Sequence, residues 1–250
     1  MMTSQITLGS LKSQTLPALF RDPSTLGQYG SPEANAAALE ACSAVIERGD
    51  VSQLAEKIAQ LVTALHNARP EQMAKAPTWR QRIFGAGLES KVRYRLARKD
   101  LENLLNECEG AAQAVRDTLR TLGQQVATHR EEDTRLQLHI QAGREYLDEH
   151  PEAGADRELG MGARERFARK LVNLAALQAS HTLSIQQLQL TQANAIDLLD
   201  RYEQTAGVLV PIWRQTTLSL ITAKHMSPEM VKAATTAHDA LVRSLSPLAH

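Results

Sequence analysis

Residues 163–206 contain neither glycine nor proline and carry a seven-residue repeat. Counting four and then three residues from Phe167 predicts one seam, made of Phe167, Leu171, Leu174, Gln178, His181, Ile185, Leu188, Gln192, Ala195, Leu199, Tyr202, Ala206 and Leu209. This spacing keeps the seam on one face of a continuous helix. At ~1.5 Å per residue the helix would be roughly 65 Å long. Because such a helix cannot bury its seam alone, a second long helix must lie along it.

A second repeat, over residues 87–149, supplies the partner within the same chain. Its seam is Leu101, Leu105, Cys108, Ala112, Val115, Leu119, Leu122, Val126, His129, Asp133, Leu136, Ile140, Gly143 and Leu147. Residues 150–162 contain a proline and three glycines and predict a turn. A short connection makes the two helices antiparallel. We therefore predict an all-α fold, an elongated helical bundle built on a long antiparallel coiled-coil hairpin with flanking shorter helices.

The flanking segments complete this prediction. Residues 1–30 mix Ser, Thr, Gly and Pro with isolated hydrophobic residues, which predicts a flexible N-terminal segment. Residues 31–76 contain two amphipathic stretches separated by Gly49, which is typical of a short αα-hairpin.

The C-terminal part of the chain is also expected to be helical. The second long helix should extend to residue 209 and Pro211 should then produce a kink or corner, because proline removes a helical hydrogen bond and clashes with the preceding turn. Two shorter helices should follow over residues 211–246. We expect residues 31–250 to form a single all-helical domain.

Composition restricts the location and the partners. Lys plus Arg equals Asp plus Glu, 28 each, so the chain has no net field to attract nucleic acid or an anionic membrane. Two scattered cysteines, Cys42 and Cys108, favour a reducing compartment. The sequence shows neither a signal peptide nor a long apolar run. We expect a cytoplasmic protein, with peripheral association at the inner face of the membrane left open.

Residues 78–99 have the most unusual composition in the chain. Their candidate binding residues are Trp79, Arg80, Arg82, Lys91, Arg93, Tyr94, Arg95, Arg98 and Lys99. This basic-aromatic segment could form salt bridges to acids such as Glu102, Glu107 and Glu109. It could instead dock on an anionic membrane or a protein partner, or bind nucleic acid, which we consider the weakest alternative. A second basic cluster, from Arg164 to Lys170, is expected to pair with Glu145, Asp148 and Glu149 across the turn.

Polar residues interrupt both seams. Antiparallel pairing should place His129 near residues 178–185, so His129, Asp133 and His181 could approach one another as weak metal-ligand candidates. The favoured interpretation is a polar layer that fixes the register, and no metal or cofactor is expected. The sequence also holds no phosphate-binding glycine loop, nucleophile elbow or Cys-x-x-Cys motif, so we expect no enzyme.

The stretch after the second repeat, Val208-Leu209-Val210-Pro211-Ile212-Trp213-Arg214-Gln215, resembles the Ile-Pro-x-Trp-x-x-Gln signature of the toxic anion resistance (TelA-like, tellurite resistance) family. Leu26–Gly30 resembles the short Gly-aromatic-Gly entry of that family, and Trp79–Tyr94 its basic region. Arg166–Leu177 resembles its Arg-x-x-Asp-Leu region, with Asn173 in place of the usual Asp.

The resemblance implies an all-helical cytoplasmic protein linked to resistance to tellurite and other toxic anions, or to a general stress response. It supplies no catalytic residues, and Pro211, Trp213 and Gln215 carry over as motif positions only. We expect a non-enzymatic scaffold that acts through protein or membrane-surface contacts, with an unknown protein partner and an unknown oligomeric state. A metal- or oxyanion-binding bundle, or a nucleic-acid-associated coiled coil, remain the alternatives.

Overall fold

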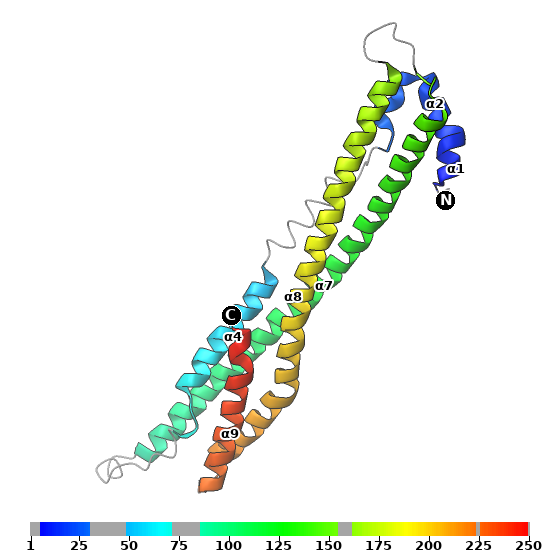
Figure 1. Ribbon diagram of the computed structural model, residues 1–250. Coiled ribbons are helices and arrows are strands. Elements are labelled where there is room, and N and C mark those ends of the chain that lie inside the picture. Colours follow the sequence, from blue (N-terminus) through cyan, green and yellow to red (C-terminus); the bar gives the residue numbers. More distant parts are fainter. Residues whose placement is uncertain (1–5, 31–48, 72–85, 155–161, 224–225, 250) are drawn as a thin grey trace, which may run out of the picture. The chain divides into compact units, whose positions relative to one another are not determined.

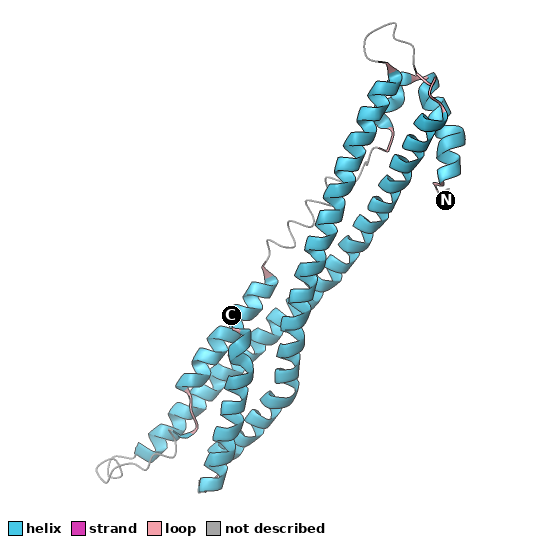
Figure 2. Ribbon diagram, viewed as in Figure 1, coloured by secondary structure: helices cyan, strands magenta, loops and turns pink. Residues whose placement is uncertain are grey.

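The computed structural model describes residues 6–30, 49–71, 86–154, 162–223 and 226–249. Within these ranges every regular element is a helix and Figure 2 shows no strand, which confirms the predicted all-α class. The two longest helices are α7, Ala86–Glu149, and α8, Ala163–Thr222. No helix in the described ranges is long and apolar enough to cross a membrane.

Contacts divide the chain into two compact units, and each unit takes one half of each long helix. Unit 1 comprises residues 1–46 and 121–191, and unit 2 comprises residues 47–120 and 192–250. The single domain expected over residues 31–250 stays a prediction, because compactness of contacts does not show which parts fold together.

Unit 1 joins the second half of α7 to the first half of α8, which lie side by side in Figure 1. The register is antiparallel, as predicted: Arg164 donates to the carbonyl of Leu147, while His181 lies against His129 further along both helices. The seam residues Phe167, Leu171 and Leu174 are buried with Leu136, Ile140 and Leu147.

Within unit 1, residues 6–30 pack against the two long helices, in contrast to the flexibility predicted for residues 1–30. This N-terminal segment forms α1 (Leu8–Ser10), the π-helical turn η1 (Leu11–Thr15), α2 (Leu16–Arg21) and the 3-10 helix η2 (Pro23–Gln28). Its scattered hydrophobic residues converge on one side, so that Leu16, Leu26 and Tyr29 are 0%, 2% and 3% exposed. Lys12 also bridges Glu145 and Glu149 at the end of α7. Burial of these side chains outweighs the weak local pattern.

Unit 2 packs α4 (Asp50–Asn67) and α9 (Pro228–Leu245) with the first half of α7 and the second half of α8. α4 buries Leu54, Ile58, Leu61 and Leu65, which lie on one face, as expected of an amphipathic stretch. α9 begins as its Ser-Pro-Glu sequence predicts, with the Ser227 hydroxyl accepting a hydrogen bond from the Met230 amide at 3.3 Å. A short 3-10 helix, η3 (Ser246–Leu248), follows. The helix expected over residues 31–48 lies outside the described residues.

The predicted boundary at residue 209 is wrong, because α8 continues through Pro211 to Thr222. The kink expected at Pro211 is present. Figure 1 shows a bend in the orange part of this helix instead of a break. Val210 and Trp213 are 5% and 0% exposed, while Pro211 faces solvent. The hydrogen bond that proline removes therefore lies on the exposed side, and core packing of its neighbours keeps the chain helical.

Candidate functional site

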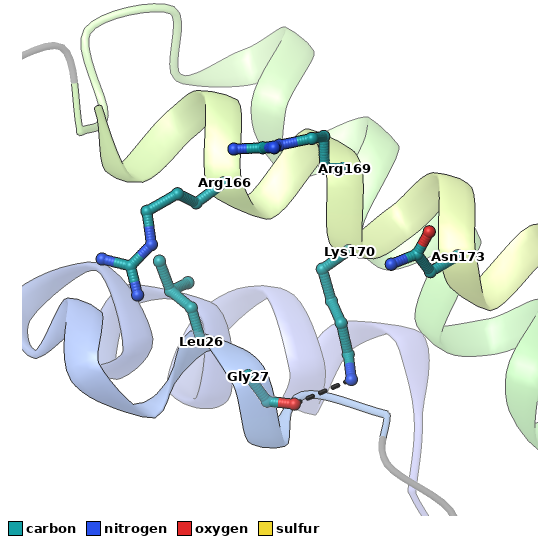
Figure 3. A pocket seen from close by; sticks show the side chains of 6 residues that line it. All are labelled: Leu26, Gly27, Arg166, Arg169, Lys170 and Asn173. Atoms are coloured by element: carbon teal, nitrogen blue, oxygen red, sulfur yellow. Dashed lines mark hydrogen bonds between the residues drawn. The ribbon is translucent and has the colours of Figure 1, made fainter. Parts of the chain in front are cut away.

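A basic pocket lies in unit 1, where the first turns of α8 face the N-terminal segment. It has a volume of about 320 Å³ and is lined by Leu26, Gly27, Arg166, Arg169, Lys170 and Asn173 (Figure 3). The four lining residues of α8 are spaced three, one and three apart, which puts them on one face of the helix. The adjacent seam residues Phe167 and Leu171 are buried and fix the orientation of that face.

Main-chain carbonyl groups orient two of the three cations. The Lys170 Nζ atom donates a hydrogen bond to the Gly27 carbonyl at 2.7 Å, and Arg166 donates to the Pro23 carbonyl at 3.2 Å. In Figure 3 both side chains extend from α8 toward the N-terminal segment, and Asn173 lies one turn beyond Lys170. Both acceptors are main-chain oxygens, so these two contacts fix the positions of the Lys170 and Arg166 side chains.

The described contacts differ from the pairing expected between this basic cluster and the end of α7. Glu145 and Glu149 bind Lys12 of the N-terminal segment, which also lowers the pKa of Glu145. Arg164 donates to the carbonyls of Leu147 and His150 at 2.8 and 2.9 Å. The sequence pattern identified the cations but could not show that Lys12 would reach the same carboxylates.

The polar residues of the two seams meet as their register predicts, but only in part. The Nδ1 atoms of His129 and His181 lie 3.0 Å apart, and both rings are buried. Asp133 instead accepts hydrogen bonds from Thr182 at 3.2 Å and from Gln137 at 2.8 Å. No group of three or more potential metal ligands is found among the described residues.

The basic-aromatic segment is described only from its second half onward. Trp79, Arg80 and Arg82 lie outside the described residues, and so does the side chain of Lys91. Tyr94 is 6% exposed and packs with Leu220 and Ile221, and burial raises its pKa to about 12. It is therefore a core residue and not a surface anchor.

Three basic residues of the segment remain on the surface. Arg93, Arg95 and Lys99 are exposed, and they lie beside Val92 and Leu96, which are 47% and 60% exposed. Arg95 also donates a hydrogen bond to the Ile221 carbonyl at 3.4 Å. The start of α7 thus presents apolar side chains flanked by cations.

Arg98 is only partly exposed and forms a salt bridge of the kind considered for this segment. It pairs with Glu102 at 3.1 Å and donates to the Thr217 hydroxyl at 3.1 Å. Glu102 also binds Arg214 at 2.8 Å. The predicted role of Glu102 as a salt-bridge partner is confirmed.

The motif residues at the bend have a structural setting. Trp213 is 0% exposed and lies in the core of unit 2, whereas Pro211 and Gln215 are exposed. Cys108 belongs to the same core, where burial raises the pKa of its thiol to about 12, so it packs as a small hydrophobic residue. Cys42 lies outside the described residues.

Comparisons with known proteins place the chain in a family. The chain is 51% identical over 249 residues to Protein KlaA of Escherichia coli, covering 98% of this chain and 97% of that protein. It is 24% identical over 218 residues to Protein KlaB of Escherichia coli, covering 77% of this chain and 57% of KlaB. No family model and no solved structure matches. Identity at this level over nearly the full length of both proteins shows that the chain belongs to the KlaA family.

Proposed function

We propose that this protein binds small oxyanions in the basic pocket and acts, without catalysing a reaction, in resistance to toxic anions. The observation that carries the proposal is that Arg166, Arg169 and Lys170 all line one hollow of about 320 Å³. The lining contains three basic side chains, in a chain whose acidic and basic residues are equal in number.

The chemistry of the lining suits an oxyanion. A guanidinium group presents a planar fork of donors that matches the oxygens of an anion, and a lysine adds a compact positive charge. The Asn173 amide can donate hydrogen bonds without adding negative charge. The likeness of residues 208–215 to the toxic anion resistance family supports tellurite and related oxyanions as ligands.

Asn173 allows a sharp test, because Asn173→Asp changes the charge of the pocket and hardly its shape. We expect tellurite, selenite or phosphate to raise the melting temperature of the wild type, since a ligand of the native state stabilises it. The variant should bind at least about tenfold more weakly, a loss of roughly 1.4 kcal/mol. Isothermal titration calorimetry measures the affinity directly.

Gln189→Glu is the matched control, because it adds the same charge at an exposed position on α8 outside the pocket lining. It should leave the affinity close to that of the wild type. An absence of any oxyanion-dependent stabilisation at millimolar concentration contradicts the proposal. Equal weakening by both variants would show that only the general field of the protein acts.

A second candidate function is contact with an anionic membrane surface at the start of α7. The exposed side chains of Val92 and Leu96 lie beside Arg93, Arg95 and Lys99, an arrangement that suits an interface of lipid headgroups and acyl chains.

Co-sedimentation with vesicles tests this candidate. Phosphatidylserine vesicles should pellet the protein and phosphatidylcholine vesicles should not, and Leu96→Gln with Lys99→Glu should abolish the effect. Leu218→Gln, at another exposed leucine of unit 2, is the control. Equal binding to phosphatidylserine and phosphatidylcholine vesicles would contradict a role of this surface in binding anionic membranes.

A further inference from the structure

Two histidines face each other across the hairpin of unit 1. His129 of α7 and His181 of α8 are 0% and 1% exposed, and their Nδ1 atoms are 3.0 Å apart. A hydrogen bond between two such atoms needs a proton on one nitrogen and a lone pair on the other. The contact therefore exists only while at least one ring is neutral.

The surroundings of the pair are largely apolar. The neighbouring layer toward the start of α7 is a small cluster of Leu122, Val126 and Leu188, with Ile185 partly buried against it. The Nε2 atom of His181 is buried and has no hydrogen-bond partner in the structure. Burial, together with the proximity of His181, lowers the pKa of His129.

Charged groups near the pair come from α7 alone among the described elements packed there. Residues 174–196 of α8 contain no Asp, Glu, Lys or Arg, so His181 is the one titratable group on that side. On α7, Glu132 raises the pKa of His129 but is itself bound by Arg135 at 2.7 Å. Asp133 accepts hydrogen bonds from Thr182 and Gln137. These carboxylates are already engaged when the pair gains positive charge.

We propose that the His129–His181 pair is an acid-sensitive latch, which holds the α7–α8 hairpin of unit 1 closed near neutral pH and releases it locally when both rings are protonated. Two imidazolium rings at this separation repel each other, and neither offers the lone pair that the hydrogen bond requires. The small apolar cluster beside the pair gives little packing to resist the separation. This proposal does not depend on anion binding.

The direction of the pH effect follows from the folded and unfolded states. An unfolded histidine has a pKa of about 6.5, and that of His129 is lower in the folded chain. The unfolded or opened chain therefore takes up the proton first. The stability due to the neutral pair is complete above about pH 6.5 and is lost as the pH falls through the folded pKa.

Hydrogen exchange measured by mass spectrometry tests the latch in the full chain. Exchange in residues 126–133 and 178–185, corrected for intrinsic rates, should rise between about pH 7.5 and about pH 5.5, which bracket the ordinary histidine pKa. Over this interval the rise should be at most about tenfold for each ring, because pH 5.5 lies about one unit below the pKa of an unfolded histidine. Residues 54–65 of α4, in the core of unit 2, serve as an internal reference.

The double variant His129→Leu/His181→Leu replaces the pair with the residue type of the surrounding seam and should abolish the rise. His139→Gln is the control, because His139 is buried in the same unit but bonds to the Arg135 carbonyl of its own helix. This control should keep the rise. An equal rise in the double variant, or unchanged exchange in the wild type, overturns the proposal.

A titration of the wild type provides a test that needs no variant. In nuclear magnetic resonance spectra, both imidazole rings should become protonated only over the pH range in which the backbone signals of residues 126–133 and 178–185 also change. Two fully protonated rings in an unchanged hairpin would also overturn the latch.

Discussion

The guanidinium group of Arg98 lies over the indole ring of Trp213, with its central carbon 5.7 Å from the ring centroid. This contact joins the first half of α7 to the bend of α8 within unit 2. Arg98 also bonds to Thr217, whose hydroxyl donates to the Trp213 carbonyl at 2.7 Å. Arg98, a residue of the basic-aromatic segment, therefore packs against Trp213 of the motif at residues 208–215 and has a structural role.

Arg98→Met should destabilise the protein by about 1–2 kcal/mol, since it removes the cation–π contact, the hydrogen bond to Thr217 and the ion pair with Glu102 while it keeps an apolar stem. Arg98→Lys should recover part of the loss, because it keeps the charge but not the planar fork. Urea unfolding at neutral pH measures both. Equal stability of the methionine variant and the wild type would contradict a structural role for Arg98.

Trp213→Ala should cost about 3–5 kcal/mol, the usual range for removing a fully buried aromatic side chain. Trp213→Phe should cost less, because the indole Nε1 atom has no hydrogen-bond partner in the structure and phenylalanine fills much of the volume. Thermal unfolding followed by circular dichroism distinguishes the two. A binding role for Trp213 would instead leave stability unchanged and alter ligand affinity.

Tyr29→Phe should destabilise the docking of the N-terminal segment by about 1 kcal/mol. The Tyr29 hydroxyl donates to the His139 carbonyl at 2.9 Å in a buried setting, and burial raises the pKa of the phenol. Because the change removes only the hydroxyl, the apolar contacts of the ring with Phe167 remain. Hydrogen exchange of residues 16–29 should accelerate in the variant, and unchanged exchange would mean that apolar packing alone holds the segment.

Two glycines of α7 should respond in opposite directions to alanine. A Cβ atom at Gly143 would lie 2.5 Å from Leu171 and 3.1 Å from Phe167, so Gly143→Ala should destabilise by about 1–3 kcal/mol through overpacking. Gly110 has nothing within 4 Å of such an atom, so Gly110→Ala should stabilise by up to about 1 kcal/mol through helix propensity. Denaturant unfolding compares them, and stabilisation by both would mean that Leu171 moves aside freely.

Hydrophobic spacing predicted the two long helices, and together with the short turn over residues 150–162 it predicted their antiparallel pairing and the meeting of His129 with His181. These features depend on a repeat that continues for many turns, so a single irregular position does not change the predicted pairing of the two helices. The start of α9 could also be predicted from the sequence, because the Ser227 cap and Pro228 affect the backbone only within the first turn.

The basic pocket could be predicted only in part. The spacing of Arg166, Arg169, Lys170 and Asn173 puts four polar groups on one helix face, which the sequence reveals. That Gly27 would lie opposite them depends on how the N-terminal segment folds back, and its hydrophobic residues follow no simple period.

The sequence by itself determined the helical class, the seams and the hairpin, because these depend on periodicity and on short-range turn chemistry. The tertiary structure alone decided whether Pro211 ends α8, which partner Arg98 meets and where residues 6–30 lie. Each of those outcomes depends on burial against residues distant in the sequence, such as Trp213 for Arg98 and the end of α7 for Lys12. Packing free energy overrides local preference at such positions.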